Sequence, residues 1–457
     1  MSASKIFKRV FTKKYLTTIF VNHIRNSGAV GLDRVRPANF EKIFPKEVSS
    51  LNKKIQNGSY RFTRYKQKLI SKGAGKYPRV ISIPTVRDRV VLRGICDFLT
   101  DTFDHVTLEI PQVKIAHLKN ALESGQYSEY IKIDLANFYP SIDHELLAKT
   151  LRKKIRKSEA LALVQNAIRT ETVAEGPRRS VGGKNSEGVP QGLSISNILA
   201  EIFIADFDRH MASQNEIFYQ RYVDDILILC KLGCAEAIAG DAIDFLKKKK
   251  LHPHELNASG ASKSSRGTIS SEFDYLGYKV FGGKLAIRSP SIQKFESSIA
   301  KIFTTYRYQL QRATNDEAKQ RTRDVCEWRL NLRITGCIFN GKRLGWVFYF
   351  SQITDTTPLR MVDSTIAAFQ KRFKLDGKIK VKRTLKAFYE ASRTDKATHH
   401  YIVNFDGMNI QEKREVLEKY LGMHQLANAS DDDIERYFKM RISAVVKELE
   451  EDLVGIS

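Results

Sequence analysis

Two adjacent aspartates interrupt an apolar, β-prone segment, and this feature constrains the chain more than any other. Residues 221–229 read RYVDDILIL, so Asp224 and Asp225 lie in a run that is otherwise typical of a buried strand. Buried carboxylates are costly unless a cation compensates for their charge. A continuous strand would send the two side chains to opposite faces, whereas a tight hairpin bend lets both reach one site. The segment therefore predicts a hairpin whose turn presents two carboxylates to a cation.

A third aspartate stands in the same kind of setting. Asp134 ends the strand-like run YIKID, and Asn137 and Pro140 indicate a turn soon after it. Carboxylates are the ligands that hard Mg²⁺ prefers, and two such ions roughly 4 Å apart can activate a hydroxyl and stabilise leaving pyrophosphate. The pattern predicts a nucleotidyl-transfer site at Asp134, Asp224 and Asp225. The alternative is that these acids are solvated turn residues, and the order of the motifs described below argues against it.

The charge of the chain points to a polyanionic partner. Its 76 Lys and Arg residues against 51 Asp and Glu give a net charge of +25, which favours nucleic acid binding over the alternative of a merely solvated basic surface. No apolar run approaches the roughly 20 residues of a membrane span, and the basic N-terminal segment lacks the apolar core of a secretory signal. The five scattered cysteines form no CxxC pair. We expect a protein of the reducing cytoplasm without disulfides, structural zinc or a membrane partner.

Helical periodicity alternates with short strand-like runs, which indicates an α+β fold. The length of 457 residues exceeds what one hydrophobic core usually supports, so we expect more than one domain. From about residue 291 the pattern becomes mostly helical and basic, and residues 371–383 form its densest positive stretch. The acidic patch DDDIER at residues 431–436 is typical of the cap and first turn of a final helix.

These motifs, in this order, resemble those of the reverse transcriptases, and specifically of the bacterial group that includes group II intron, retron and phage-defence enzymes. The resemblance covers roughly residues 28–285 and continues more loosely to about residue 360. Besides the aspartates, it rests on the fingers signature, the PQG motif, the LxLN-(x)-K motif, the primer grip and the GWxxYF thumb pattern, at residues 68–91, 188–200, 251–263, 273–280 and 332–353. Two departures are local: Arg34 replaces the second glycine of the GxDG element, and Ile195 stands where the family usually has proline.

The resemblance implies which residues bind the incoming dNTP. Lys72 and Arg79 would contact the triphosphate, and Gln191 would lie against the nucleotide while Gly192 allows close approach to the template. Lys263 would contact the triphosphate or the pyrophosphate. These assignments add cations around the predicted carboxylates.

The resemblance also assigns the neighbourhood of Asp134. Leu135 would join Asp134, Asp224 and Asp225 at the metal ions and would contact the dNTP. Tyr139 would pack under the sugar and reject a 2′-hydroxyl, which favours deoxynucleotides, although packing into the core is the alternative.

Two groups of ring-bearing residues have less specific interpretations. His252 and His254 flank a proline and are interpreted as surface loop residues rather than metal ligands. The aromatic residues of the thumb are interpreted as core rather than as stacking platforms for bases, and they are Trp346, Phe348, Tyr349 and Phe350.

The implied fold is an α+β right-hand polymerase with fingers, a palm built on an antiparallel sheet, and a helical thumb. The expected parts are an N-terminal helical segment with fingers at 1–105, the palm at 106–288 with part of the fingers at about 145–190, the thumb at 289–385, and a C-terminal helical extension at 386–457.

The implied activity is that of an RNA-directed DNA polymerase that adds dNTPs to a DNA product with two Mg²⁺ ions, for which Mn²⁺ can substitute. Length, the lack of an HNH nuclease pattern and the thumb-plus-tail pattern favour the phage-defence group, whose members typically copy a noncoding RNA in the bacterial cytoplasm. A template-independent or protein-primed terminal DNA polymerase is an alternative on the same fold. An RNA-binding protein like a group II intron maturase is disfavoured by three clustered acids, and an RNA polymerase by Tyr139. A homo-oligomer is left open.

Overall fold

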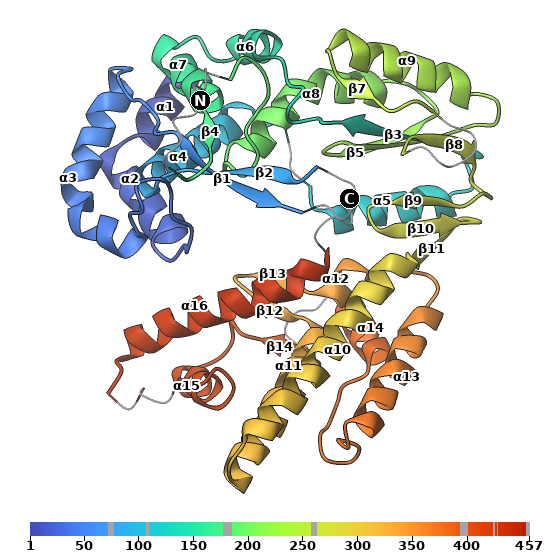
Figure 1. The fold of residues 1–457 in the computed structure, drawn as a ribbon. Coiled ribbons are helices and arrows are strands. Elements are labelled where there is room, and N and C mark those ends of the chain that lie inside the picture. Colours follow the sequence, from blue (N-terminus) through green and yellow to red (C-terminus); the bar gives the residue numbers. More distant parts are fainter. Residues whose placement is uncertain are drawn as a thin grey trace. The chain divides into compact units, whose positions relative to one another are not determined.

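The chain folds into two compact units. The computed structural model describes residues 1–71, 77–106, 109–176, 185–256, 263–393, 401–423, 426 and 428–453. Unit 1 comprises residues 1–109 and 129–267, and unit 2 comprises residues 110–128 and 268–457. Both combine helices with antiparallel strand pairs, which confirms the predicted α+β class (Figure 1). The four-part division into fingers, palm, thumb and extension is finer than these two units and stays a prediction.

Unit 1 contains the three aspartates and most of the family motifs. Its described helices are α1 (Ala3–Val10), α2 (Lys13–Ile19), the π-helix η1 (Phe20–Ile24), α3 (Pro37–Gln56), α4 (Val86–Thr102), α6 (His144–Arg152), α7 (Ser158–Arg169), α8 (Ser196–Ala212) and α9 (Ala235–Lys248). Its described strands are β1 (Tyr65–Ile70), β2 (Arg79–Ile83), β3 (Glu129–Ala136), β4 (Thr172–Val173), β5 (Phe218–Tyr222), β6 (Asp225–Cys230), β7 (His252–Pro253) and β8 (Ser265–Thr268), the last of which ends just past the unit boundary.

A sheet with the strand order β5-β6-β3-β7 forms the floor of unit 1, with β8 also paired to β3. The strands β3 and β6 are antiparallel, and β6 is buried along its whole length. Helix α8 lies beside this sheet in Figure 1, and its apolar residues Ile198, Phe203 and Phe207 join the core of the unit. Burial on both faces explains why residues 226–229 are continuously apolar rather than alternating.

A second sheet of unit 1 has the order β2-β1-β4 and carries the fingers signature. The β1–β2 pair is antiparallel, from Lys66 opposite Ile83 to Ile70 opposite Arg79. Directly after β2, the Thr85 side chain caps helix α4 by accepting a hydrogen bond from the Asp88 backbone N–H. The fingers signature therefore forms strand β2 and the start of helix α4, and these two elements hold the residues between them in place.

Unit 2 is mostly helical. Its described helices are α5 (Pro111–Glu123), α10 (Ser289–Arg312), α11 (Asp316–Thr335), α12 (Trp346–Tyr349), α13 (Thr357–Arg372), α14 (Thr384–Ser392), α15 (Ile410–Lys419), α16 (Asp431–Glu450) and the 3₁₀ turn η2 (Glu451–Leu453). Its described strands are β9 (Phe273–Tyr275), β10 (Tyr278–Phe281), β11 (Lys284–Ile287), β12 (Cys337–Phe339), β13 (Lys342–Leu344) and β14 (Val403–Asn404). They form the sheets β11-β10-β9 and β13-β12-β14.

The aromatic residues of the predicted thumb pattern lie in the core, as expected. Trp346, Phe348, Tyr349 and Phe350 are all buried, and the Trp346 ring stacks on Phe295 of α10 with 4.3 Å between ring centroids. The Tyr349 hydroxyl donates to the Leu276 carbonyl at 2.9 Å. Their role within unit 2 is packing, because buried rings have no face left for a base.

The final helix begins where the acidic patch predicted. Ser430 caps α16 by accepting a hydrogen bond from the Asp433 backbone N–H, and three aspartates occupy the first turn, where the helix dipole favours negative charge. One face of α16 packs into a core shared with α11, β12 and α15. The segment predicted as an extension therefore contributes to the hydrophobic core of unit 2.

Two further expectations concern membranes and cysteines. In the described part of the chain, no helix is both long enough and apolar enough to cross a membrane. All five cysteines are free thiols: Cys230, Cys326 and Cys337 are buried, and Cys234 is exposed.

Candidate active site

The register of two strands brings the predicted carboxylates together. Asp134 on β3 lies directly opposite Asp225 at the start of β6. The backbone N–H of Leu135 donates to the Asp224 carbonyl at 3.2 Å, which ties the end of β3 to the neighbouring turn. Two aspartates that are far apart in sequence therefore face each other across one strand pair, with Asp224 next to them.

The predicted hairpin bend at the acidic pair is confirmed. Tyr222 pairs with Asp225, so Val223 and Asp224 form a two-residue loop between β5 and β6. Val223 has a φ of +57°, a left-handed conformation that β-branched residues rarely adopt. Tight hairpin loops require a positive φ at the first or at both central positions, and glycine usually supplies it. The loop is therefore strained at the residue that precedes the acidic pair.

Basic side chains compensate for the carboxylates. The Lys263 ammonium lies 3.2 Å from Asp134 Oδ1, and the Lys132 ammonium lies 3.8 Å from Asp225 Oδ1. Burial raises the pKa of the Asp224 carboxyl above its ordinary value and the negative charge of Asp134 raises it further, while Lys263 and Arg79 oppose the shift. The raised pKa therefore reflects mainly the burial of the carboxyl, and the charge of Asp134 adds to it.

One histidine lies at the site against expectation. His254 was interpreted as a surface loop residue, but its Nε2 lies 3.2 Å from Asp134 Oδ1 and its backbone N–H donates to the Asp134 carbonyl at 2.9 Å. The cause is the pairing of β7 with β3, which places Pro253 opposite Leu135. Neither the proline nor the residue spacing indicates this pairing, so it could not be predicted from local sequence patterns.

Tyr139 is held in a fixed position next to the carboxylates. It lies three residues beyond β3, and its hydroxyl donates to the Asn197 side-chain oxygen at 2.9 Å. Burial raises the pKa of the Tyr139 hydroxyl, with smaller contributions from the charges of Glu201 and Asp224. The ring also packs partly against the core of unit 1. A fixed ring at this position suits a steric role. No sequence motif pointed to Asn197 as its hydrogen-bond partner.

The PQG loop contacts strand β2. The backbone N–H of Ser82 donates to the Gln191 carbonyl at 2.8 Å. Gly192 has a φ of +95°, and a Cβ there would lie 2.6 Å from Ile81 Cγ2. The glycine is thus required by close packing against the fingers strand. After the loop, the Ser196 hydroxyl donates to the Pro190 carbonyl at 2.6 Å, so a serine forms the junction to α8 where the family usually has proline nearby.

Among the remaining predicted residues, Arg79 is exposed at the start of β2, and Gln191 is half-buried. Leu135 is buried, with its backbone in the β3 pairing. Lys72 lies outside the described residues. The structure therefore brings together Asp134, Asp224, Asp225 and Lys263, and places Tyr139 and Leu135 beside them.

The fit of the site to divalent metal ions depends on its donor set. Within the described ranges, no group of three or more His, Cys, Asp or Glu side chains is already arranged as a metal site, and the predicted ligand set of Asp134, Asp224 and Asp225 stays a prediction. The donors themselves are nevertheless carboxylates, which suit hard cations, and Asp134 lies directly opposite Asp225 with Asp224 in the adjoining turn. The residues fit such ions in type, while the lysines balance part of the charge.

The antiparallel sheet thus presents a strand-paired carboxylate and an acidic hairpin turn beside a largely buried tyrosine, which is the arrangement that the motifs predicted. Residues 70–280 match the family model described as reverse transcriptase (RNA-dependent DNA polymerase). The family match confirms the predicted resemblance for the part of the chain that contains the aspartates.

Curated relatives agree with the bacterial lineage that the motifs predicted. Protein YkfC of Escherichia coli K12 is 27% identical over 195 residues, which cover 40% of this chain and 49% of that protein. The retron Ec83 reverse transcriptase of Escherichia coli is 32% identical over 173 residues, which cover 36% of this chain and 52% of that protein. The chain thus spans about half the length of these relatives. A solved structure of apo telomerase from Candida tropicalis matches at a TM-score of 0.42 and 14% identity, covering 94% of this chain and 75% of that one.

Proposed function

We propose that the chain is an RNA-directed DNA polymerase that adds dNTPs to a growing DNA strand with two Mg²⁺ ions, for which Mn²⁺ can substitute. The observation that carries the proposal is the pairing of Asp134 with Asp225 beside the strained turn at Asp224, within residues that match the reverse transcriptase family model. The carboxylates of these three residues would hold the ions, with the backbone of Leu135 beside them.

In this proposal the acidic residues of the site hold the metal ions, and the basic residues contact the triphosphate. When bound, the ions would supply Lewis acidity for attack of the primer hydroxyl and for departure of pyrophosphate. Lys263 balances Asp134, and its side chain is 66% exposed, so a triphosphate can reach it. Arg79 is exposed on the fingers strand, and its charge already lowers the pKa of Asp224, so it acts on the same site. Lys72 belongs to the same proposal as a triphosphate contact.

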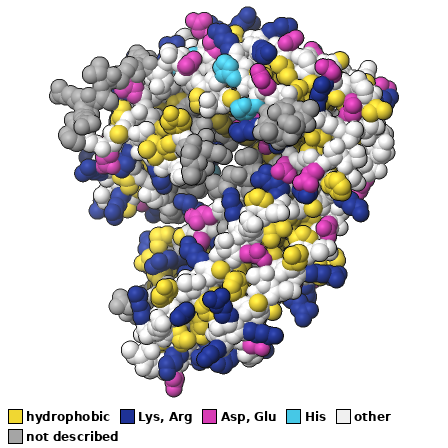
Figure 2. Space-filling model, turned by 45° about the vertical axis from the view of Figure 1, so that its right-hand side comes forward, with side chains coloured by type: hydrophobic (Ala, Val, Ile, Leu, Met, Phe, Trp, Pro, Cys, Tyr) yellow, Lys and Arg dark blue, Asp and Glu magenta, His cyan; other side chains and the backbone are white. Residues whose placement is uncertain are grey.

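The nucleic acid partner is inferred from charge. With a net charge of +25, the chain favours phosphate-rich partners, and Lys and Arg side chains recur over the face shown in Figure 2. We propose an RNA template, specifically a noncoding RNA copied in bacterial cytoplasm as part of phage defence. The match to a retron reverse transcriptase and the free thiols support this proposal.

The decisive test is a primer-extension assay with the purified full-length chain, an RNA template, dNTPs and Mg²⁺. Asp225→Asn removes a charge but preserves size, and we expect it to lower incorporation by about 100-fold or more because the metal ions lose a ligand. Glu236→Gln is the matched control, since Glu236 is exposed on α9 and pairs only at the surface with Arg266. It should retain wild-type activity.

Several outcomes would contradict the proposal. Undiminished incorporation by Asp225→Asn would refute the metal assignment. Products whose sequence does not follow the template would instead favour the terminal polymerase. Sequencing the nucleic acid that copurifies with the chain from bacteria tests the template, and the absence of any enriched noncoding RNA would remove that part of the proposal.

A further inference from the structure

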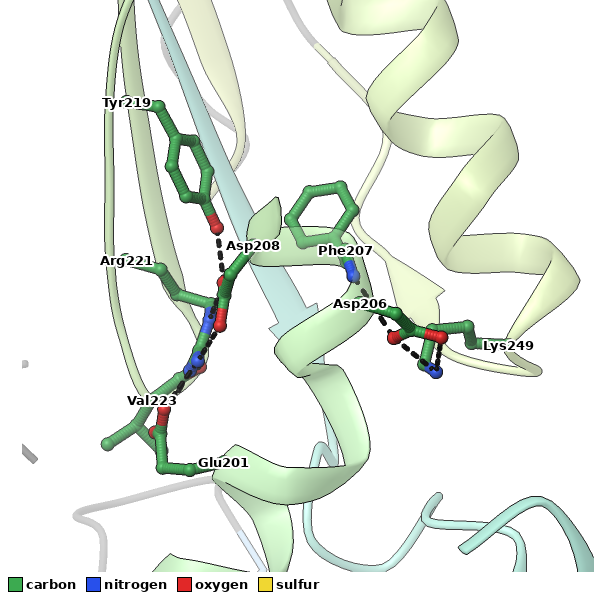
Figure 3. A network of polar contacts seen from close by, with 8 residues as sticks. All are labelled: Glu201, Asp206, Phe207, Asp208, Tyr219, Arg221, Val223 and Lys249. Carbon is green, nitrogen blue, oxygen red and sulfur yellow. Dashed lines mark hydrogen bonds and ion pairs between the residues drawn. The ribbon is translucent and has the colours of Figure 1, made fainter. Parts of the chain in front are cut away.

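Arg221 is a buried basic residue of the RYVDD segment, three residues before Asp224. It lies on β5, pairs in register with Ile226, and has a side chain that is only 3% exposed. The guanidinium points toward helix α8, where it contacts Glu201 and Asp208 (Figure 3). A buried cation of this kind requires several partners to offset its desolvation.

Every N–H group of Arg221 has an acceptor. Nε and Nη2 donate to the two carboxylate oxygens of Asp208 at 2.8 and 2.7 Å. Nη1 donates to Glu201 Oε1 at 3.0 Å, and Nη2 donates to the other oxygen of Glu201. Nη1 also donates to the backbone carbonyl of Val223 at 2.9 Å. A guanidinium has five donors, so four anchor it to α8 and the fifth holds the hairpin loop.

The anchor is rigid and the loop is strained. Glu201 and Asp208 are seven residues apart and therefore lie on one face of α8, a helix whose apolar residues join the core of unit 1. The Tyr219 hydroxyl donates to Asp208 at 2.6 Å and fixes that carboxylate further. Val223, by contrast, keeps its φ of +57° within a two-residue loop that also contains Asp224.

We propose that Arg221 is a positioning residue, which clamps the Val223 carbonyl to α8 and so holds the loop in the conformation that presents Asp224 and Asp225 to the metal ions. The role deepens the proposed polymerase function and rests on it for its activity readouts. Arg221 acts through the loop backbone and touches neither substrate nor metal.

Helix α8 also provides a matched control. Lys249 is largely buried, and its ammonium donates to both carboxylate oxygens of Asp206 at 2.7 and 3.0 Å. Asp206 is on the same helix as Glu201 and Asp208, but this ion pair lies on the side away from the hairpin (Figure 3). Lys249→Met therefore removes an ion pair of α8 without removing a contact to the loop.

The test compares Arg221→Met, Arg221→Lys and Lys249→Met in the full-length chain. For Arg221→Met we expect amide exchange of the 222–225 loop to rise about tenfold, kcat to fall about tenfold or more, and the Mg²⁺ midpoint to rise, with an unchanged KM for the template. Arg221→Lys should be intermediate, because an ammonium has three donors and no planar fork. Lys249→Met should change each of these quantities less than about twofold.

Equal effects of Arg221→Met and Lys249→Met would overturn the proposal, because they would show a general loss of stability. Val223→Gly added to Arg221→Met should restore part of the loop protection and of kcat, since glycine adopts a positive φ without strain. No recovery would also count against the clamp. If Arg221→Met does not fold, Glu201→Gln tests the same anchor.

The failure of the proposed function can be told apart from the failure of the clamp. A wild-type chain that does not polymerise would refute the function, whereas amide exchange of the loop depends on no activity and still decides whether Arg221 restrains it.

Discussion

At the scale of single residues, charge compensation determines how the site is built. Asp134 faces Lys263 and His254, and Asp225 faces Lys132, so the carboxylates are partly balanced without a metal ion. The acids were predictable because two adjacent aspartates in an apolar run are rare and costly. Their partners were less so, since Lys132 reaches Asp225 only through the β3–β6 register and His254 reaches Asp134 only through β7.

Tyr139 gives a prediction at the residue scale. Tyr139→Ala should increase ribonucleotide incorporation relative to deoxynucleotides by about tenfold or more, because the ring that would exclude a 2′-hydroxyl is lost. Tyr139→Phe is the matched control: it keeps the ring and removes only the hydrogen bond to Asn197, so discrimination should persist. The measurement is the ratio of kcat/KM for the two nucleotides. A ratio that Tyr139→Ala leaves unchanged would show that the ring is only a packing residue.

At the scale of elements, helices α8 and α16 make contacts that their own sequences do not indicate. Helix α8 supplies Asn197 to Tyr139, and Glu201 and Asp208 to Arg221, so one helix positions two parts of the site. Helix α16 was expected in a C-terminal extension, and its N-terminus was predicted correctly from the acidic patch. Its packing was not, because the core that it enters also contains residues of α11 and β12, which are far from it in the sequence.

Helix α16 gives a prediction at this scale. Phe438 is 2% exposed and packs edge-to-face with Phe405, so Phe438→Ala should lower the free energy of unfolding of unit 2 by about 3–5 kcal/mol through cavity formation. Met440→Ala is the control, because Met440 lies on the same helix and is 48% exposed. Denaturant unfolding followed by tryptophan fluorescence reports on this core, where Trp328 packs. Equal losses for both variants would mean that α16 is not a core element.

At the scale of the whole molecule, the excess of basic residues is the dominant property. The net charge of +25 is larger than the number of basic residues paired with acids at the site. It implies an electrostatic contribution to nucleic acid binding that does not depend on base sequence.

The salt dependence of RNA binding tests this property. If six or more phosphates are contacted, the affinity of the full-length chain for RNA should fall by about 10³-fold between roughly 50 and 200 mM salt, with a linear log–log plot. Fluorescence anisotropy of a labelled RNA gives the affinity, and an uncharged-backbone analogue of the same sequence is the control and should bind weakly at both concentrations. An affinity that is independent of salt would show that the basic surface does not contact the RNA backbone.

Sequence patterns alone predicted the α+β class, the hairpin at Asp224 and Asp225, the family motifs, the start of α16 and the buried aromatic residues of unit 2. These follow from local patterns, because side-chain period, turn residues and caps act over a few positions. Tertiary structure decided the rest: the pairing that brings His254 to Asp134, the contact between Gly192 and β2, the Arg221 clamp and the entry of α16 into a core. Each of these depends on strand register or helix packing between distant segments, and no local pattern specifies which distant partner a buried side chain will meet.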